Sequence, residues 1–214
     1  MTWLQTASGR AFDLLAPCAD MVDFETDVPE ALARIARFTG HVRSGVYSVA
    51  QHCCLGSDLF LRRDDAEAAR AFLLHDAHEA YLGDIATPIA QALATFVDDG
   101  HEARMARPRH VALPEVRVQI ADLKRRVDRA VYAAAGLPWP LSADLHWRVT
   151  EMDVAMLNAE RRALMGPAPR RWAEAIEAAT PAPIGRLPVW PWPKAADEYR
   201  ARLHRLFPAL KRAA

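Results

Sequence analysis

Cysteine is scarce in this sequence, with three residues in 214: Cys18, Cys53 and Cys54. Their number is odd, two of them are adjacent, and none forms a CxxC pair. This pattern excludes a disulfide framework and a zinc knuckle. A reducing, cytoplasmic location is therefore expected. Packing is the favoured role for Cys53 and Cys54, because buried cysteine is common and adjacent helical side chains diverge by about 100°.

The sequence also lacks an excess of charge of either sign. Lys plus Arg and Asp plus Glu number 27 each, and the pI is about 7.1. Such a chain has no general field for nucleic-acid polymers or anionic membranes. The sequence has no apolar run of about 18 residues, so membrane insertion is not expected. It also has no N-terminal basic region followed by an apolar run, so export is not expected. The expected partner is a small molecule, held by local charges if it is anionic.

Alternation of period two is nearly absent, and this excludes a large sheet. It occurs only around 3–4 and 11–14, on either side of a Ser8-Gly9 turn, which predicts an irregular or two-stranded N-terminal cap. Helical periodicity, caps and breakers predict the rest of the chain. The predicted helices span about 28–39, 44–61, 66–82, 87–94, 116–135, 143–165, 170–179 and 195–207. Residues 98–111 are polar and ambiguous around Pro108.

These elements predict an all-α fold, an irregular helical bundle that forms a single domain over residues 1–214. Its core is expected over about 29–165, and 166–214 is expected to form a Pro- and Trp-rich extension with a C-terminal helix. The segment VWPWPK, 189–194, lacks the basic strip of a base-stacking platform. Its tryptophans are expected to pack, at a subunit contact if the chain forms a homo-oligomer.

Four polar side chains interrupt an apolar stretch, AFLLHDAHEAYLGD, at residues 71–84. On a helix, positions three and four apart share a face, so His75, Asp76 and Glu79 are expected to project together. Burying them without partners would cost several kcal/mol, which favours a divalent metal over the alternative of an idle, exposed helix edge. Leu82 replaces the second His of HExxH and so excludes a zincin site. His78 points elsewhere on a helix and is expected not to be a ligand.

Further metal ligands must come from other segments. His52 and Asp153 each stand as one ionisable residue within an apolar, helical stretch. Together with His75 and Asp76 they offer two imidazole nitrogens and two carboxylates for one divalent ion. That donor set is borderline in softness and leaves Zn, Mn, Co, Ni, Fe and Mg open.

The ordered set His52, His75-Asp76 and Asp153 resembles the H…HD…D signature of the HD-domain metal-dependent phosphohydrolases. The string HDAHEAYLGDIATP is similar to the HD-x-x-E…GD…TP string of the 5′-deoxynucleotidase branch and its phage-type deoxynucleotide hydrolase relatives. The resemblance covers roughly residues 29–165. It implies that these four residues ligate the metal, and that Glu79 and Asp84 are the acid and base acting on water and leaving group.

The same resemblance implies substrate contacts. Arg37 and Phe38 occupy the places of an arginine–aromatic pair, so Arg37 would grip phosphate and Phe38 would border the sugar or base. Thr87, in the TP element, is a further expected contact. Ala90 stands where a lysine is frequent, and His41 and Arg43 could supply its replacement, although a solvated loop is the alternative for that segment.

Residue chemistry alone predicts metal-assisted hydrolysis of a phosphate ester. The resemblance implies a 5′-deoxynucleotidase that releases phosphate from deoxynucleoside monophosphates. Two alternatives stay open: a deoxynucleoside triphosphate triphosphohydrolase, and a regulatory module that binds a nucleotide without hydrolysing it. A di-iron oxidative site would need more bridging carboxylates and a second group of histidines than the sequence offers.

Overall fold

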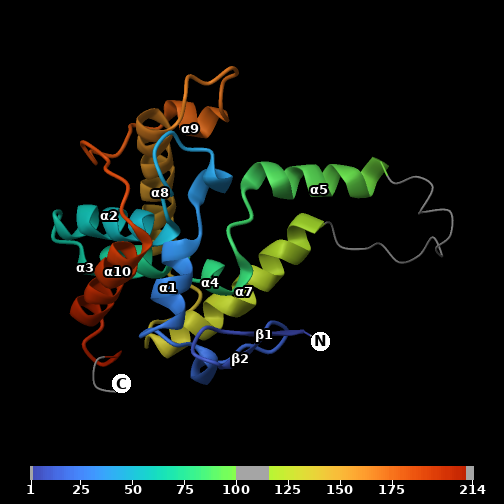
Figure 1. Cartoon of the computed structure of the whole chain (residues 1–214), viewed down its shortest axis with the longest axis vertical. Helices are drawn as coiled ribbons and strands as arrows, with labels where there is room; N and C mark the ends of the chain where they lie inside the picture. The colour runs from blue at the N-terminus through green and yellow to red at the C-terminus, as the bar shows by residue number, and fades with distance from the viewer. Residues whose placement is uncertain (1, 100–115, 211–214) are drawn as a thin grey trace.

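The computed structural model describes residues 2–99 and 116–210, and it is an all-α bundle with a small N-terminal hairpin (Figure 1). The predicted fold class is confirmed. The hairpin strands are β1, Trp3–Gln5, and β2, Ala11–Asp13, and the short 3₁₀ turns are η1, Ala19–Met21, and η2, Arg37–Gly40. The α-helices are α1, Asp27–Arg34; α2, Val49–Leu61; α3, Ala66–Leu74; α4, Glu79–Leu82; α5, Thr87–Asp99; α7, Val116–Ala134; α8, Ala143–Leu164; α9, Glu174–Ala178; and α10, Trp192–Leu206.

The N-terminal hairpin is anchored to the helices through one aromatic side chain. The strands are antiparallel, with Leu4 opposite Phe12. The Phe12 ring is fully buried and stacks on Tyr81 of α4, with 3.6 Å between ring centroids. The hairpin therefore closes the core at the end of the bundle where α1, α4 and α7 meet (Figure 1).

Helices α2 and α3 form the centre of the bundle and approach closely at Gly56. A Cβ atom at this position would lie 2.1 Å from the ring of Phe72, so only glycine permits the contact. His52 lies one turn before Gly56 on α2, and His75 directly follows α3. The packing that the Gly56–Phe72 contact sets thus brings the two histidines side by side.

The remaining helices cover this pair. Helix α10 packs on α1, α2 and α3, and α8 packs on α3 and α2 (Figure 1). The main core also includes residues before 29 and after 165: Phe12, Ala195, Ala196, Tyr199, Leu203 and Phe207. The C-terminal helix is thus part of the central packing.

The prediction of one helix over 66–82 was wrong. Helix α3 ends at Leu74, and α4 begins at Glu79. The carbonyl oxygens of Ala71 and Leu73 accept from the hydroxyl groups of Tyr132 and Tyr199, at 3.2 and 2.7 Å. The amides that would have bonded these oxygens in an α-helix turn to the carbonyl three residues back instead. The segment 75–78 is therefore a tight turn, and it carries the polar side chains.

The predicted end of the helix at 28–39 and the predicted start of the helix at 44–61 were also wrong. One backbone pairing explains both differences. Ala36 and Ser48 form an isolated antiparallel bridge, with Arg37 N donating to Tyr47 O and Val49 N donating to Ile35 O. This pairing ends α1 at Arg34 and delays α2 to Val49, where the Ser48 side chain caps the helix. Arg37 and Phe38 consequently lie in η2 and not on a helix.

Most other helix bounds agree with the prediction to within two residues. Helix α5 runs five residues beyond the predicted end, and α9 is shorter than predicted. Helix α10 begins at Trp192, three residues early, because proline is accepted in a first helical turn. The ambiguous segment around Pro108 lies outside the described residues. Within 2–99 and 116–210, none of the helices combines the length and apolar character that a membrane crossing requires.

Candidate metal centre

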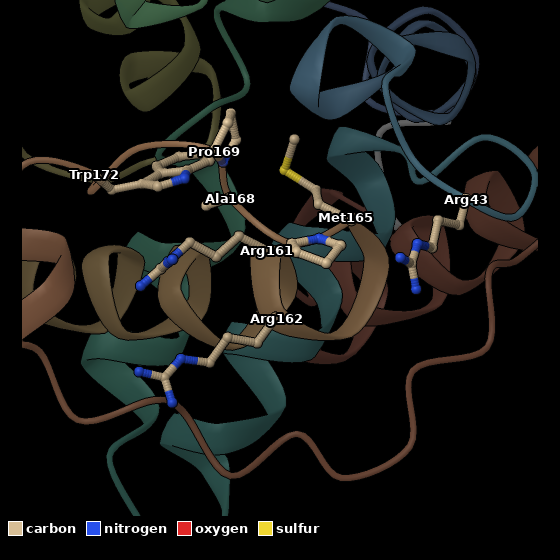
Figure 2. A pocket seen from close by; sticks show the side chains of 9 residues that line it. Arg43, Arg161, Arg162, Met165, Ala168, Pro169 and Trp172 are labelled. Atoms are coloured by element: carbon tan, nitrogen blue, oxygen red, sulfur yellow. The ribbon is translucent and has the colours of Figure 1, made fainter.

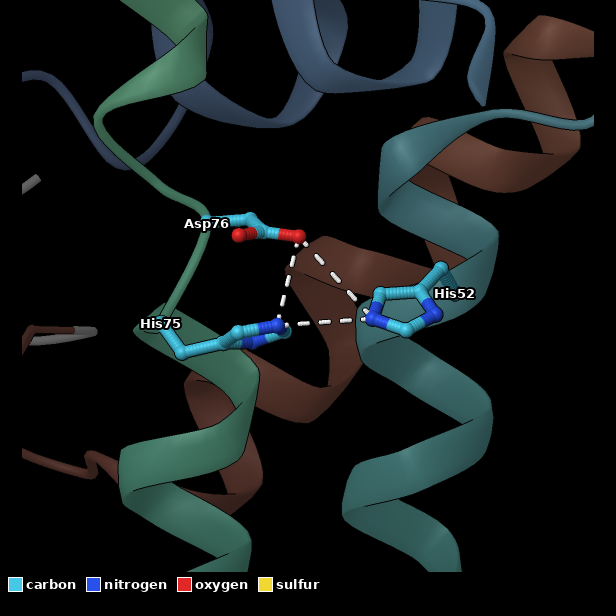
Figure 3. Close-up of side chains that lie close together, drawn as sticks. All are labelled: His52, His75 and Asp76. Atoms are coloured by element: carbon cyan, nitrogen blue, oxygen red, sulfur yellow. Dashed lines mark hydrogen bonds and ion pairs between the residues drawn. The ribbon is translucent and has the colours of Figure 1, made fainter. Parts of the chain in front are cut away.

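Four predicted ligands from three separate parts of the chain converge at one point. His52 comes from α2, His75 and Asp76 from the turn after α3, and Asp153 from α8. His52 Nε2 lies 3.4 Å from His75 Nε2 and 3.2 Å from Asp153 Oδ1. Asp76 Oδ2 lies 3.2 Å from His75 Nε2 and 3.9 Å from His52 Nε2 (Figure 3). The structure thus brings these residues together.

Hydrogen bonds at the far side of each imidazole fix which nitrogen faces the cluster. His52 Nδ1 lies 2.7 Å from Glu160 Oε1, and His75 Nδ1 lies 2.7 Å from the carbonyl oxygen of Phe72. A carboxylate and a carbonyl only accept, so both Nδ1 atoms carry a proton and donate it. In the neutral form of each ring, which is the form that binds a metal, Nε2 therefore presents its lone pair to the cluster.

These lone pairs fit a bound cation. When both rings are neutral, two imidazole nitrogens and the carboxylate oxygens of Asp76 and Asp153 face one another as acceptors, so a cation or a proton must lie between them. Burial would lower the pKa of both histidines, but in the metal-free protein the neighbouring carboxylates raise it. In the part of the chain that the structure describes, Asp153 Oδ1 is buried and has no hydrogen-bond partner. Imidazole and carboxylate are the usual ligands of divalent transition metals in such groups. The cluster His52, His75 and Asp76, with Asp153 beside it, can therefore hold a metal ion.

Arg37 and Glu160 form a second layer around the cluster. Arg37 donates to Asp76 Oδ2 at 3.2 Å, and its other nitrogens lie 3.8 Å from Asp153 Oδ1 and 3.3 Å from Glu160 Oε2. Glu160 is fully buried and also accepts from Tyr47 Oη at 2.6 Å. Three carboxylates here face one guanidinium, so the surroundings are negative and suit a cation.

Sequence reasoning missed Glu160 and Tyr47. Glu160 lies seven residues after Asp153, two turns along the same helix face, so its position could have been found from helical periodicity. Tyr47 gives no comparable signal, because it lies in an extended segment before α2.

The charges of the cluster are strongly coupled. Burial alone would raise the pKa of Asp76, but His75 and Arg37 hold it well below its usual range. Burial likewise opposes ionisation of Asp153, and the two histidines hold its pKa well below the ordinary value. The pKa of Glu160 is lowered in the same way, against burial, by His52 and Arg37. All three carboxyls are therefore ionised at neutral pH.

Glu79 and Asp84 behave differently. Burial, and then the charges of Asp76 and Asp84, raise the pKa of Glu79 to about 9. Burial also raises the pKa of Asp84, with Arg37 opposing this rise and Asp76 adding to it. In the metal-free protein at neutral pH, Glu79 is thus a neutral carboxylic acid beside ionised Asp76, and it can give a proton.

The raised pKa of Glu79 predicts a pH-dependent stability. In the metal-free protein the folded state keeps a proton on Glu79 that the unfolded chain releases above pH 4.5, so folding stability falls as pH rises from 4.5 to about 9. Glu79→Gln cannot titrate. Free energies of unfolding are measured by urea denaturation in EDTA. The value for Glu79→Gln minus the value for wild type is expected to be about 2 kcal/mol larger at pH 8 than at pH 6.5. If this difference between the two proteins were the same at pH 6.5 and pH 8, the assignment of a proton to Glu79 would be wrong.

Glu160 predicts an effect on metal affinity. Glu160→Gln weakens the charge-assisted bond that orients His52, and partners of this kind are worth about 10- to 100-fold in affinity. Titration with Zn²⁺ should therefore give a Kd raised by that factor. Glu151→Gln, exposed on the same helix α8, is the matched control and should bind as wild type does. Equal affinities for Glu160→Gln and wild type would show that Glu160 does not support the ligand.

The predicted substrate contacts lie in different surroundings. Phe38 is half-buried in η2, with a positive φ of 56°, and its ring lies 5.9 Å from the Arg37 guanidinium. Thr87 is exposed at the start of α5. Their roles, like those of Glu79 and Asp84 as acid and base, stay predictions.

Arg43 lies in a surface pocket at the end of α8. The lining includes Arg161, Arg162 and Trp172. Figure 2 shows Arg161 and Arg162 extending to one side while Arg43 lies at the other. Arg162 comes nine residues after Asp153, about half a turn round the helix, and so faces away from the metal cluster. The substrate role of Arg43 also stays a prediction.

His78 and the two adjacent cysteines occupy buried positions near the cluster. His78 Nδ1 lies 2.9 Å from Asp128 Oδ1 of α7, a carboxylate that sequence reasoning missed although it interrupts an apolar helix face. Cys53 and Cys54 are fully buried in the main core, as their packing role predicts. Burial raises the pKa of Cys53 to about 11, which keeps this thiol neutral.

Fold and site together define an all-α protein with a buried His/Asp cluster that can hold a metal ion. The chain belongs to the family of the uncharacterized protein RCAP_rcc00048 of Rhodobacter capsulatus, with which it is 30% identical over 168 residues, 77% of this chain and 74% of the relative. It is also 29% identical over 164 residues to the uncharacterized protein YfdR of Escherichia coli, covering 77% of this chain and 73% of that protein. No family model matches the chain.

Proposed function

We propose that this chain is an HD-domain metal-dependent phosphohydrolase that releases phosphate from deoxynucleoside 5′-monophosphates. The observation that carries the proposal is the convergence of His52, His75, Asp76 and Asp153 from three parts of the chain, in the order of that signature. The acidic Glu79 beside this cluster adds to it, because a site that only held a metal would have no use for a protonated carboxyl. The nucleotide class of the substrate rests on the resemblance.

A divalent ion, when bound by these four ligands, supplies Lewis acidity towards water and a phosphoryl oxygen. Arg37 brings a permanent positive charge to the edge of the cluster, and its planar guanidinium suits a phosphate group. Because Arg37 forms ion pairs with Asp76 and Glu160, its guanidinium group is held in position before a substrate binds. A chain without net charge can in this way hold an anionic substrate.

Glu79 and Asp84 share the proton transfers. Glu79 carries a proton at neutral pH and donates it to the departing alkoxide oxygen. Asp84 is less buried than Glu79, and it serves as the base that takes a proton from the attacking water. The pKa of Glu79, raised to about 9, suits the acid, and the greater exposure of Asp84 suits the base.

The proposal includes the surroundings in which the enzyme works. We propose a single divalent ion of the Zn, Mn, Co, Ni, Fe or Mg group as the working cofactor, and a cytoplasmic location. All three cysteines are free, and Cys18 is exposed, which suits a reducing compartment.

Turnover of a nucleotide panel tests this function. The protein is stripped with EDTA, reloaded with one equivalent of each divalent ion, and given ribo- and deoxynucleoside mono- and triphosphates. Inorganic phosphate from deoxynucleoside monophosphates is the expected product. Release of triphosphate from deoxynucleoside triphosphates would instead favour the triphosphohydrolase. Nucleotide binding without turnover under any ion would overturn the proposal in favour of a regulatory module.

A further inference from the structure

A second group of metal-ligand side chains adjoins the first and shares Asp76 with it. Asp76, His78 and Glu79 each place one ligand atom within 4.8 Å of the ligand atoms of the other two. Residues 75–78 form a turn here, whereas on a straight helix His78 would point about 100° away from the adjacent residues.

Two atoms of this group are buried without partners. His78 is 6% exposed and Glu79 is 5% exposed. His78 Nδ1 donates to Asp128, and across residues 2–99 and 116–210 neither His78 Nε2 nor Glu79 Oε2 has a hydrogen-bond partner. A buried imidazole lone pair with no donor costs about 1–3 kcal/mol, so the arrangement calls for a bound group that accepts electron pairs.

We propose that Asp76, His78 and Glu79 form a second divalent-ion site, bridged to the first through the Asp76 carboxylate. In Figure 3 one oxygen of Asp76 points to His52 and His75, and the other is directed away from them. A bridging carboxylate uses its two oxygens in this way. The donors, one imidazole and two carboxylates, suit a borderline ion such as Zn²⁺.

Asp128 gives the second site its support. Its hydrogen bond to Nδ1 fixes the tautomer of His78 and leaves Nε2 as the ligand atom. A carboxylate behind a metal-binding histidine also raises the basicity of the ring. His52 has the same arrangement with Glu160, so a carboxylate fixes the tautomer of both histidines.

The second ion inhibits the enzyme, a consequence that rests on the proposed function. A Glu79 carboxylate that binds an ion cannot hold the proton that the leaving group needs. The second ion also binds more weakly than the first, because it has one protein ligand fewer and meets the charge of the first ion at short range. Turnover is therefore expected to rise and then fall as Zn²⁺ increases.

Ion counting tests the site without reference to activity. Equilibrium dialysis of the full chain against Zn²⁺ should show His78→Gln binding one ion fewer than wild type. His146→Gln, an exposed histidine on α8, is the control and should bind as many ions as wild type. Asp128→Asn should keep that ion with affinity lowered about 10- to 100-fold, which checks the site should His78→Gln fold poorly. Equal counts for wild type and His78→Gln, with no weakening in Asp128→Asn, would overturn the proposal.

Turnover of a deoxynucleoside monophosphate tests the inhibition. Wild type should lose most of its maximal rate as the second ion fills its site, whereas His78→Gln should reach its own maximum and hold it. A wild-type rate that keeps rising while the second ion binds would overturn the inhibitory role. Absence of turnover in every variant would contradict the proposed function, and the ion counts would still decide the second site.

Discussion

Asp76→Ala is expected to lose metal and turnover together. Asp76 contributes to both ion sites and holds Arg37, so its removal takes away a direct ligand and the partner of the phosphate-binding side chain. Residues that only support a ligand cost up to about 100-fold in affinity, and a direct ligand should cost more than that. With one equivalent of Zn²⁺ per chain, the variant should retain no ion after dialysis. Hydrolysis should fall to background.

The control for this variant is Asp197→Ala, which removes an exposed carboxylate on α10. It should bind metal and turn over as wild type does. Circular dichroism must show that Asp76→Ala keeps its helical content, since it leaves Arg37 buried with fewer partners. An Asp76→Ala protein that folds and still binds the first ion at wild-type affinity would refute the ligand assignment.

The position of the cluster was open to sequence reasoning because each ligand is an anomaly in its own segment. His52 and Asp153 each have mostly apolar neighbours within a helix, and the sequence order with His75-Asp76 marks them as one set. Such residues tolerate burial only with partners, so looking for a shared partner was justified. The all-α fold followed from the same helical periodicity.

The shape of the segment that carries His75 to Glu79 was beyond sequence reasoning. Its composition favours a continuous helix, but the helix ends where Tyr132 and Tyr199 donate to the carbonyl oxygens of α3. These tyrosines lie 61 and 126 residues further along the chain. No local pattern contains that information, since tertiary hydrogen bonds override propensity here.

The wrong prediction of a continuous helix affected the interpretation of His78 most. Helical geometry directed it away from the cluster, whereas the turn brings it to Asp76 and Glu79. Asp128 could have been noticed by the rule that found Asp153, because it too interrupts a buried helix face. No sequence pattern predicts the contact between Asp128 and His78, because that contact depends on how α7 packs.

Glu79→Gln is expected to keep the first metal ion and lose rate. Glutamine has nearly the same shape but cannot donate the proton that the leaving group takes. General acid catalysis contributes about 10²- to 10⁴-fold, and kcat should fall by a factor in that range. The measurement uses one equivalent of Zn²⁺ per chain, so that only the site with His52, His75, Asp76 and Asp153 fills.

Comparison of substrates separates loss of a proton donor from general damage to the site. A monophosphate ester with a leaving group of low pKa, such as nitrophenol, needs little protonation, so Glu79→Gln should hydrolyse it with a much smaller loss than the deoxynucleotide. Glu151→Gln, exposed on α8, should leave both rates unchanged. An equal loss on both substrates would assign Glu79 to positioning, and normal turnover of the nucleotide would remove it from the mechanism. The acid role stands only if the loss follows the basicity of the leaving group, because a proton donor matters in proportion to the charge it neutralises.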